Sequence, residues 1–414
     1  MQRRLGFSLP LLILAACSSP AEPGVRPAVL TELPRALSPA ELRIIEAGNA
    51  FAFDLLREST RKLPADSNAF LSPLSASMAL GMALNGANGE TFAAMQTSLR
   101  LTGMAEAEIN QGYRDLIALL GELDSRTEIA IANSIWGHEG FGIEPAFIEA
   151  AKTFFDAEVA TLDFGSASAV STINEWVSKS TGGRIPRLLD QISDAEILFL
   201  INAIYFKGKW RETFDPQDTE NGPFQAADGR TRTAALMSQT DTLRYDETAE
   251  YQAVDLLYGN GAFAMTLFLS KAGRTPADVL AGLNQAAWRD LAGRFRDANV
   301  HLTLPRFRMD YSRQLTDDLT ALGMGIAFDD ARADFSRIAD VRPARLYLTR
   351  VEQKTFVEVN EEGTEAAAAT AVGVGVTSAP EVVEMRVDRP FMFAIRERLS
   401  GAVLFLGLMN VVGE

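Results

Sequence analysis

Cysteine and histidine are nearly absent from this chain of 414 residues. Its one cysteine, Cys17, has no partner for a disulfide bond within the chain, so packing must hold the fold together. The two histidines, His138 and His301, are far apart in the sequence and lie in no recognisable motif. A histidine-dependent triad or a histidine-rich metal site has little to draw on. We therefore expect neither histidine to be catalytic, and we expect no metal and no cofactor.

Positive charge is also scarce. Lys and Arg number 39 against 54 Asp and Glu, which gives a net charge of −15. We expect no nucleic-acid partner, because binding a phosphate backbone needs clustered basic side chains. The sequence has no internal repeat, and no linker rich in Pro, Gly or Ser follows residue 40. With 47% hydrophobic residues it can form one large core, and we predict a single domain over residues 38–414.

The N-terminus has the composition of a targeting segment. Arg3 and Arg4 precede an apolar stretch over residues 7–16, which is too short to span a bilayer as a permanent helix. The sequence Leu14-Ala15-Ala16-Cys17 follows directly. It resembles a bacterial lipobox, in which the signal is cleaved before a cysteine that is then lipidated.

We therefore predict a signal peptide over residues 1–16 and lipidation of Cys17. A flexible tether over residues 17–37 follows, since it holds four prolines and few large apolar residues. The protein would then be exported and anchored by its lipid to a bacterial membrane, in the periplasm or at the cell surface. The alternative is an ordinary secretory signal with a chance cysteine.

Helix signals dominate the first half of the domain. Ser38-Pro39-Ala40-Glu41 has the pattern of a capping box with Pro at the first helical position, and apolar residues follow at helical spacing through Leu56. A second helix is predicted from Ser72-Pro73 to a stop at Asn85-Gly86. The other helical patterns lie at 91–99, 105–121, 144–155, 168–180, 275–293 and 312–322.

Strand signals dominate the second half. Leu399-Ser400-Gly401 indicates a hairpin between the last two strands. Because helices and strands do not alternate regularly, the pattern argues against a parallel α/β fold and predicts an α+β domain. Strand character is strongest at 128–136, 197–206, 262–269, 300–309, 345–360, 390–398 and 402–412.

Residues 361–380 are rich in Ala and Gly, yet they alternate as a strand does. Alternate residues of a strand face opposite sides of a sheet. One parity set is small or apolar and carries no charge, so it can lie on a core while the other set faces solvent. The pattern indicates a segment that is a loop in one state and a buried strand in another; a plain surface loop is the alternative. The uncharged set is Thr364, Ala366, Ala368, Thr370, Val372, Val374 and Val376.

Several separate stretches, from about residue 41 to 414, together resemble the serpin family. Each stretch alone is a weak signal, but their order and spacing are specific. They are Leu71-Ser72-Pro73-Leu74-Ser75, Thr181-Gly182-Gly183-Arg184-Ile185, Asn202-Ala203-Ile204-Tyr205-Phe206-Lys207-Gly208-Lys209-Trp210, Leu304-Pro305-Arg306-Phe307, the run from Phe356 to Ala367, and Asp388-Arg389-Pro390-Phe391.

The resemblance implies an α+β serpin fold, with helices packed on three mostly antiparallel β-sheets. It implies an exposed reactive-centre loop, here over about residues 361–385. In inhibitory serpins a protease attacks this loop and forms an acyl-enzyme, and the cut loop then inserts as a new strand of the largest sheet. The protease is carried to the far pole and distorted, so hydrolysis stalls. The resemblance thus implies a monomeric inhibitor of serine proteases rather than an enzyme.

The start of this loop fits the inhibitory hinge pattern. Inhibitory members keep Gly, then Thr or Ser, then small residues, and this chain matches the pattern throughout from Gly363 to Thr370. By family spacing from Glu361, the reactive bond is expected at Thr377-Ser378, with Val376-Thr377 as the runner-up. Counting back from Arg389 suggests a bond about two residues later. The hinge residues carried over are Glu361, Gly363, Thr364, Ala366 and Ala368.

The expected reactive residue is small and uncharged, and no Lys or Arg lies between Lys354 and Arg386. A trypsin-like pocket has nothing to pair with there, so an elastase-like or subtilisin-like serine protease is the predicted target. Heparin-type activation needs a basic helix, but residues 105–123 contain one Arg among several acids. No polyanion cofactor is expected.

The resemblance also assigns two supporting clusters. Ser72, Ser75 and Asn202 match a polar cluster beneath the opening sheet, called the shutter, where Gln353 stands in place of the usual His. Gln can donate and accept, so the network can survive, but a pH-sensitive group is lost. Glu361, Arg306 and Trp210 match the breach, where insertion begins. A non-inhibitory serpin acting as a binding or chaperone-like module is the alternative function.

Overall fold

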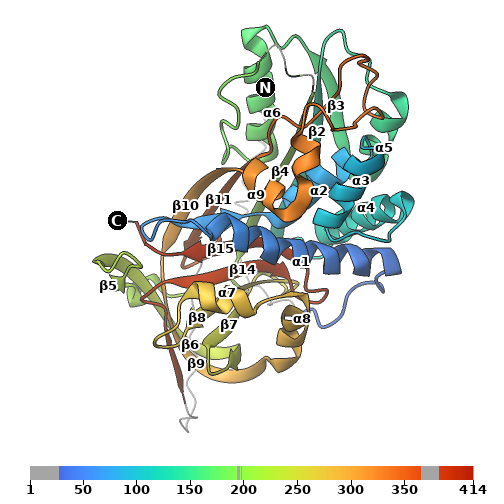
Figure 1. Cartoon of the computed structure of the whole chain (residues 1–414). Helices are drawn as coiled ribbons and strands as arrows, with labels where there is room; N and C mark the ends of the chain where they lie inside the picture. The colour runs from blue at the N-terminus through green and yellow to red at the C-terminus, as the bar shows by residue number, and fades with distance from the viewer. Residues whose placement is uncertain (1–27, 194–195, 197, 365–381, 414) are drawn as a thin grey trace, which may run out of the picture.

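The computed structural model describes residues 28–193, 196, 198–364 and 382–413. Figure 1 shows helix α1 crossing the middle of the molecule, with one sheet and most helices on one side of it and a second sheet on the other. The nine α-helices of the described part are α1 (Pro39–Thr60), α2 (Pro73–Leu84), α3 (Gly89–Ser98), α4 (Glu106–Glu122), α5 (Pro145–Phe155), α6 (Ala167–Ser180), α7 (Pro276–Gly282), α8 (Gln285–Arg294) and α9 (Thr316–Leu319).

Fifteen strands are described. They are β1 (Ala69–Leu71), β2 (Thr127–His138), β3 (Ala157–Leu162), β4 (Leu198–Lys209), β5 (Glu220–Gln225), β6 (Thr231–Glu247), β7 (Tyr251–Leu257), β8 (Phe263–Ser270), β9 (Arg296–Pro305), β10 (Phe307–Gln314), β11 (Glu352–Asn360), β12 (Gly363–Thr364), β13 (Val383–Arg386), β14 (Phe391–Glu397) and β15 (Val403–Met409).

The strands form a six-stranded sheet and a nine-stranded sheet. The six-stranded sheet has the order β10-β11-β12-β4-β2-β3. The nine-stranded sheet follows β1-β15-β14-β8-β7-β6-β9-β13, with β5 paired to β6. The 17-residue strand β6 joins its two halves, because β6 pairs with β5 near its start and with β7 near its end. With the halves counted separately, this is the expected three-sheet serpin fold of a mixed α+β chain.

The first helix begins as its sequence predicts. The backbone N–H of Glu41 donates to Ser38 Oγ at 3.1 Å, and Ser38 N–H donates to Glu41 Oε2 at 2.7 Å. This capping box satisfies donors that the first turn leaves without a partner. Helix α2 is buried along nearly its whole length, since it lies under the six-stranded sheet.

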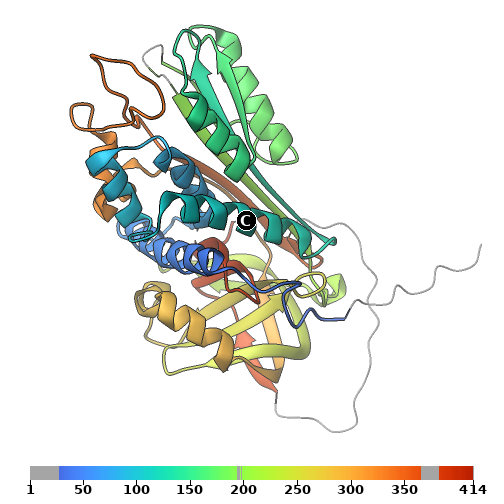
Figure 2. The ribbon, with the colours of Figure 1, turned by 90° about the vertical axis from the view of Figure 1, so that its right-hand side faces the viewer.

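Helix α6 covers the opposite face of the six-stranded sheet, as Figure 2 shows near the top of the molecule. It packs Ile173 and Val177 against Trp136 of β2 and Phe199 and Ile201 of β4. Odd-numbered residues of β4 near its start therefore face α6. The even-numbered residues Leu198 and Leu200 face the main core.

Some boundaries differ from the sequence predictions. The helix predicted at 275–293 is two helices, because Asn284 accepts a hydrogen bond from Ala287 N–H and caps a new helix. The pattern at 345–360 becomes a strand only from Glu352. β10 extends to Gln314, so the helix predicted from 312 begins at Thr316.

Within the described residues no helix is both long enough and apolar enough to cross a bilayer. The same part of the chain has no group of three His, Cys, Asp or Glu side chains placed to hold a metal ion.

Candidate functional site

The hinge forms a two-residue strand, β12, inside the six-stranded sheet. Gly363 lies opposite Asn360 of β11 and Lys209 of β4, and Thr364 lies opposite Val359 and Gly208. Gly363 has φ +150°, and a Cβ there would lie 2.1 Å from the carbonyl oxygen of Gly208. Only glycine fits this position, which explains the residue that the hinge pattern requires.

Thr364 is buried, with 1% of its surface exposed. Its hydroxyl lies 2.7 Å from the hydroxyl of Tyr258, and the Tyr258 ring stacks on Trp210 with 4.4 Å between centroids. Complete burial raises the pKa of Tyr258, so this hydroxyl stays protonated as a hydrogen-bonding group. A charged side chain at position 364 would have to be buried in this aromatic pocket.

Glu361 and Arg306, the two charged breach candidates, form an ion pair. Arg306 Nε donates to Glu361 Oε1 at 2.6 Å, and the Thr219 hydroxyl donates to the same oxygen. Burial alone would raise the pKa of Glu361, but the hydrogen bonds from Arg306 and Thr219 outweigh burial and hold this pKa below its ordinary value.

Trp210 fixes the backbone that leads into the hinge. Its indole Nε1 donates to the carbonyl of Asn360 at 2.9 Å, and its backbone N–H donates to the carbonyl of Glu362 at 2.8 Å. Phe214 N–H donates to the carbonyl of Glu361 at 2.9 Å. Three successive carbonyls are thereby held, and β12 begins from a fixed direction.

The shutter residues come together in two separate groups. On the β11 side, Gln353 Oε1 accepts from Ser72 N–H at 2.9 Å, and Gln353 Nε2 donates to the Ser72 carbonyl at 2.7 Å. On the β4 side, Ser75 Oγ donates to Asn202 Oδ1, and Asn202 Nδ2 donates to Asn133 Oδ1 at 2.6 Å. Both groups are anchored to α2, and within the described part of the chain no hydrogen bond joins Gln353 to Asn202.

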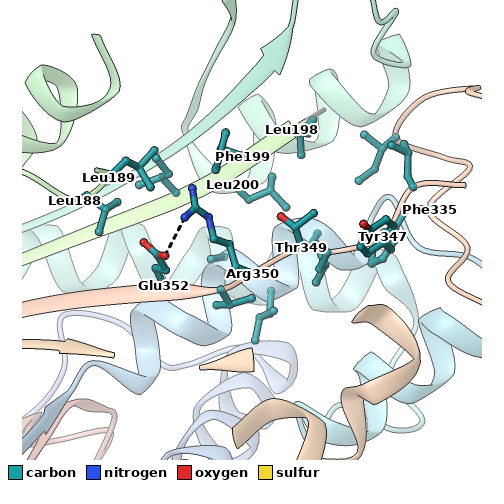
Figure 3. A pocket seen from close by; sticks show the side chains of 18 of the residues that line it. Leu188, Leu189, Leu198, Phe199, Leu200, Phe335, Tyr347, Thr349, Arg350 and Glu352 are labelled. Atoms are coloured by element: carbon teal, nitrogen blue, oxygen red, sulfur yellow. Dashed lines mark hydrogen bonds and ion pairs between the residues drawn. The ribbon is translucent and has the colours of Figure 1, made fainter. Parts of the chain in front are cut away.

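β4 and β11 flank β12, yet these two strands do not pair with each other in the described ladders. Beyond β12, a cavity lies between the first residues of β4 and the chain that enters β11, over the core face of α2. Figure 3 shows Leu198, Phe199 and Leu200 facing Tyr347, Thr349 and Arg350 across it.

Six predicted site residues lie outside the described residues. They are the hinge residues Ala366 and Ala368, the reactive-bond candidates Val376, Thr377 and Ser378, and the lipidation candidate Cys17.

Sequence reasoning missed two contributors to this site, Tyr258 and Thr219. Both contact the hinge across more than one hundred residues of sequence, so no local pattern marks them.

Several known proteins that resemble this chain are named as protease inhibitors or as serpins. A family model described as "Serpin (serine protease inhibitor)" matches residues 46–411. The bovine leukocyte elastase inhibitor is 34% identical over 383 residues, covering 88% of this chain and 98% of the relative. An uncharacterised serpin-like protein of Thermococcus kodakarensis is also 34% identical, and the match covers 89% of this chain and 86% of that relative.

Solved structures agree. Tengpin, a thermophilic serpin, in its native state gives a TM-score of 0.84 at 26% identity, covering 94% of this chain and 98% of that chain. Its latent-state structure gives 0.78 at 25% identity, covering 92% and 100%. The chain belongs to the serpin family.

Proposed function

We propose that this serpin is an irreversible inhibitor of serine proteases of the elastase-like or subtilisin-like kind, acting by loop cleavage, acyl-enzyme formation and strand insertion. It supplies no catalytic group of its own. The protease provides the nucleophile, and the serpin provides the strand that follows the cut.

The observation that carries this proposal is β12, because the first two residues of the new strand are already paired on both sides. Extending the β12 register along β4 and β11 puts Val372 opposite Leu200 and Val351. Val374 then comes opposite Leu198 and Thr349. These positions line the cavity between β4 and the chain entering β11.

The apolar side chains of β4 and of the segment before β11 suit the valines of the inserting strand. Leu198, Leu200 and Val351 are only half-buried, although they face the main core. Valines arriving beside them would complete their burial, at about 1.5 kcal/mol or more for each valine. Ladder hydrogen bonds on both edges add about 1 kcal/mol each. Insertion on this register is therefore strongly favourable.

The proposed target follows from the reactive residue and from the relatives. Thr377 is small and uncharged and suits a shallow apolar specificity pocket. The names of the bovine, human and porcine relatives say that they inhibit leukocyte elastase.

Covalent trapping is tested by mixing the chain from Ser18 with pancreatic elastase or subtilisin and separating the products on a denaturing gel. A band at the summed mass that resists SDS is expected, and the released peptide fixes the reactive bond.

The register is tested by two variants. Val372→Glu should convert the protein into a cleaved substrate, because the glutamate would enter the core. Ala371→Glu, of opposite parity, should still trap. Trapping by Val372→Glu would contradict the register.

We also propose that the protein is exported and held at a bacterial membrane by a lipid on Cys17. The motif Leu14-Ala15-Ala16-Cys17 supports this. Cells expressing the full chain and fed radiolabelled palmitate should label it, and Cys17→Ser should abolish the label while leaving trapping unchanged. Equal labelling of both chains would rule out this anchor.

A further inference from the structure

The cavity beyond β12 is lined mainly by apolar side chains, with a few polar ones at its edges. Its walls come from α2, from the start of β4 and from the segment entering β11. Several of the apolar side chains that line it are only partly buried, so they still have surface to cover. The lining includes Leu80, Leu198, Leu200, Phe335, Ile338 and Leu348.

Arg350, at one side of this cavity, has its charge satisfied. Its Nε lies 3.2 Å from Glu196 Oε1, and its guanidinium also lies 3.2 Å from Glu352 Oε1. Another guanidinium N–H donates to the carbonyl of Gln191 at 3.0 Å. Figure 3 shows Arg350 turned toward Glu352. Two carboxylates therefore balance this cation, and it offers a ligand little.

Arg345, in the exposed part of the same lining, differs from Arg350. Its one hydrogen bond in the described structure is a long one, 3.4 Å from Nη1 to the carbonyl of Ala333. No described carboxylate forms an ion pair with it. Asp334 is near enough for Arg345 to help lower its pKa, after the hydrogen bonds from Ser336, but the two are not paired. The cavity thus combines an apolar interior with an unpaired cation at its exposed rim.

We propose that this cavity binds a medium-chain carboxylate, such as a fatty acid anion, with its tail among the leucines and its carboxylate on Arg345. Arg can hold a carboxylate through two parallel N–H donors, and the tail gains free energy with each methylene buried. The bound tail lies beside Leu198 and Leu200, so it blocks the positions that an inserting strand needs. This regulatory part rests on the proposed function; the binding part does not.

Binding is tested by calorimetry on the chain from Ser18 with octanoate, decanoate and 1-octanol. We expect one saturable site, with decanoate binding about tenfold tighter than octanoate because two more methylenes are buried. Octanoate should bind about tenfold tighter than 1-octanol, because only the carboxylate pairs with Arg345. Ala79→Leu, which narrows the cavity from α2, should weaken both anions.

Arg345→Gln should remove the preference for octanoate over 1-octanol. Arg342→Gln is the matched control, because Arg342 is exposed nearby but already pairs with Asp340 and does not line the cavity. Absence of a saturable site, or an unchanged preference in Arg345→Gln, would overturn the binding proposal.

The regulatory part is tested by the denaturing gel with saturating decanoate. More cleaved serpin and less complex are expected for the wild type, and a weaker effect for Arg345→Gln at the same concentration. An unchanged ratio would overturn this part. If no protease is trapped even without decanoate, the proposed function fails, and the calorimetric result still decides the binding site.

Discussion

At the scale of single residues, the hinge shows why the family pattern specifies small side chains. Gly363 has no room for a Cβ, and Thr364 fits under Tyr258 with its hydroxyl paired. The two requirements differ, because one comes from the backbone at Gly363 and the other from the buried aromatic pocket around Thr364, in which a single hydroxyl is paired. Both constrain the residues that must enter the sheet first.

Thr364→Arg should abolish trapping, because a guanidinium in this pocket is buried without an acid. The protein should instead be cleaved as a substrate, with the stoichiometry of inhibition rising at least tenfold in a titration of elastase activity. Glu365→Arg makes the same change at the neighbouring position of opposite parity and should keep the wild-type stoichiometry. Equal stoichiometry for Thr364→Arg and the wild type would contradict the burial argument.

Glu361 makes the breach sensitive to acid. Its pKa in the folded protein is below the ordinary value of 4.5, so its pairing stabilises the fold above that pH and is lost as pH falls through the folded pKa. Glu361→Gln should lower the free energy of unfolding by about 1 kcal/mol at pH 7. The difference from wild type should shrink toward zero as the pH falls below 4.5 and through the folded pKa.

Urea unfolding from pH 3 to pH 8 measures this difference. Glu358→Gln, on β11, is the control, because Glu358 forms no ion pair in the described structure, and it should show no such pH dependence. A deficit for Glu361→Gln that stays constant down to pH 3 would mean that the carboxylate charge is not what matters.

At the scale of elements, the sequence predicted the long periodic helices and the hydrophobic strands well. The residues around α1 carry a full capping box and a regular apolar stripe, so local physics alone decides that helix. The sequence did not predict β5, β6 and β7, which have polar stretches and take their form from neighbouring strands. Tertiary pairing decides such strands.

The contacts of the functional site were likewise predicted only in part. Family spacing placed Glu361 with Arg306, and Ser75 with Asn202, and the structure brings each pair together. Family spacing did not predict that Gln353 would bond the backbone of Ser72, apart from the Ser75–Asn202 pair. That arrangement depends on where α2 begins relative to β11, which no motif records.

The segment over residues 28–37 lies against the domain, although its composition suggested a tether. Leu30 N–H donates to the carbonyl of Asn260 at 2.9 Å, and Arg398 bonds the carbonyls of Leu30 and Gly261. Leu30, Leu33 and Leu37 pack against the core. The turn at Gly259 and Asn260 directly follows Tyr258, so this segment supports the turn next to the tyrosine that contacts Thr364.

Changing Leu30, Leu33 and Leu37 together to Ser should lower Tm by about 5–10 °C, because roughly 3 kcal/mol of apolar burial is lost. Differential scanning calorimetry measures the shift. Leu42→Ser, at a leucine on α1 with 47% of its surface exposed, should change Tm by less than about 1 °C. A triple variant as stable as Leu42→Ser would show that the segment contributes nothing.

At the scale of the whole molecule, the fold keeps a place for one more strand. β12 occupies the first two positions between β4 and β11, and a cavity lies farther along the same line. The uncleaved protein therefore leaves apolar surface and strand edges unsatisfied. The native-state relative also fits this chain better than its latent-state structure does.

Cutting the loop should therefore stabilise the protein rather than weaken it. Cleavage by a protease that is not trapped frees the strand to insert, and the new ladder and the buried valines should raise Tm by more than 20 °C. Calorimetry before and after limited proteolysis measures the rise.

Val372→Glu should show a much smaller rise in Tm than Ala371→Glu, because only the side chain at position 372 must enter the core. A cleaved wild type that melts at the uncleaved temperature would mean that the strand does not insert, and the non-inhibitory alternative would then hold. A large rise without trapping would instead mean that insertion works and that a different protease is the target.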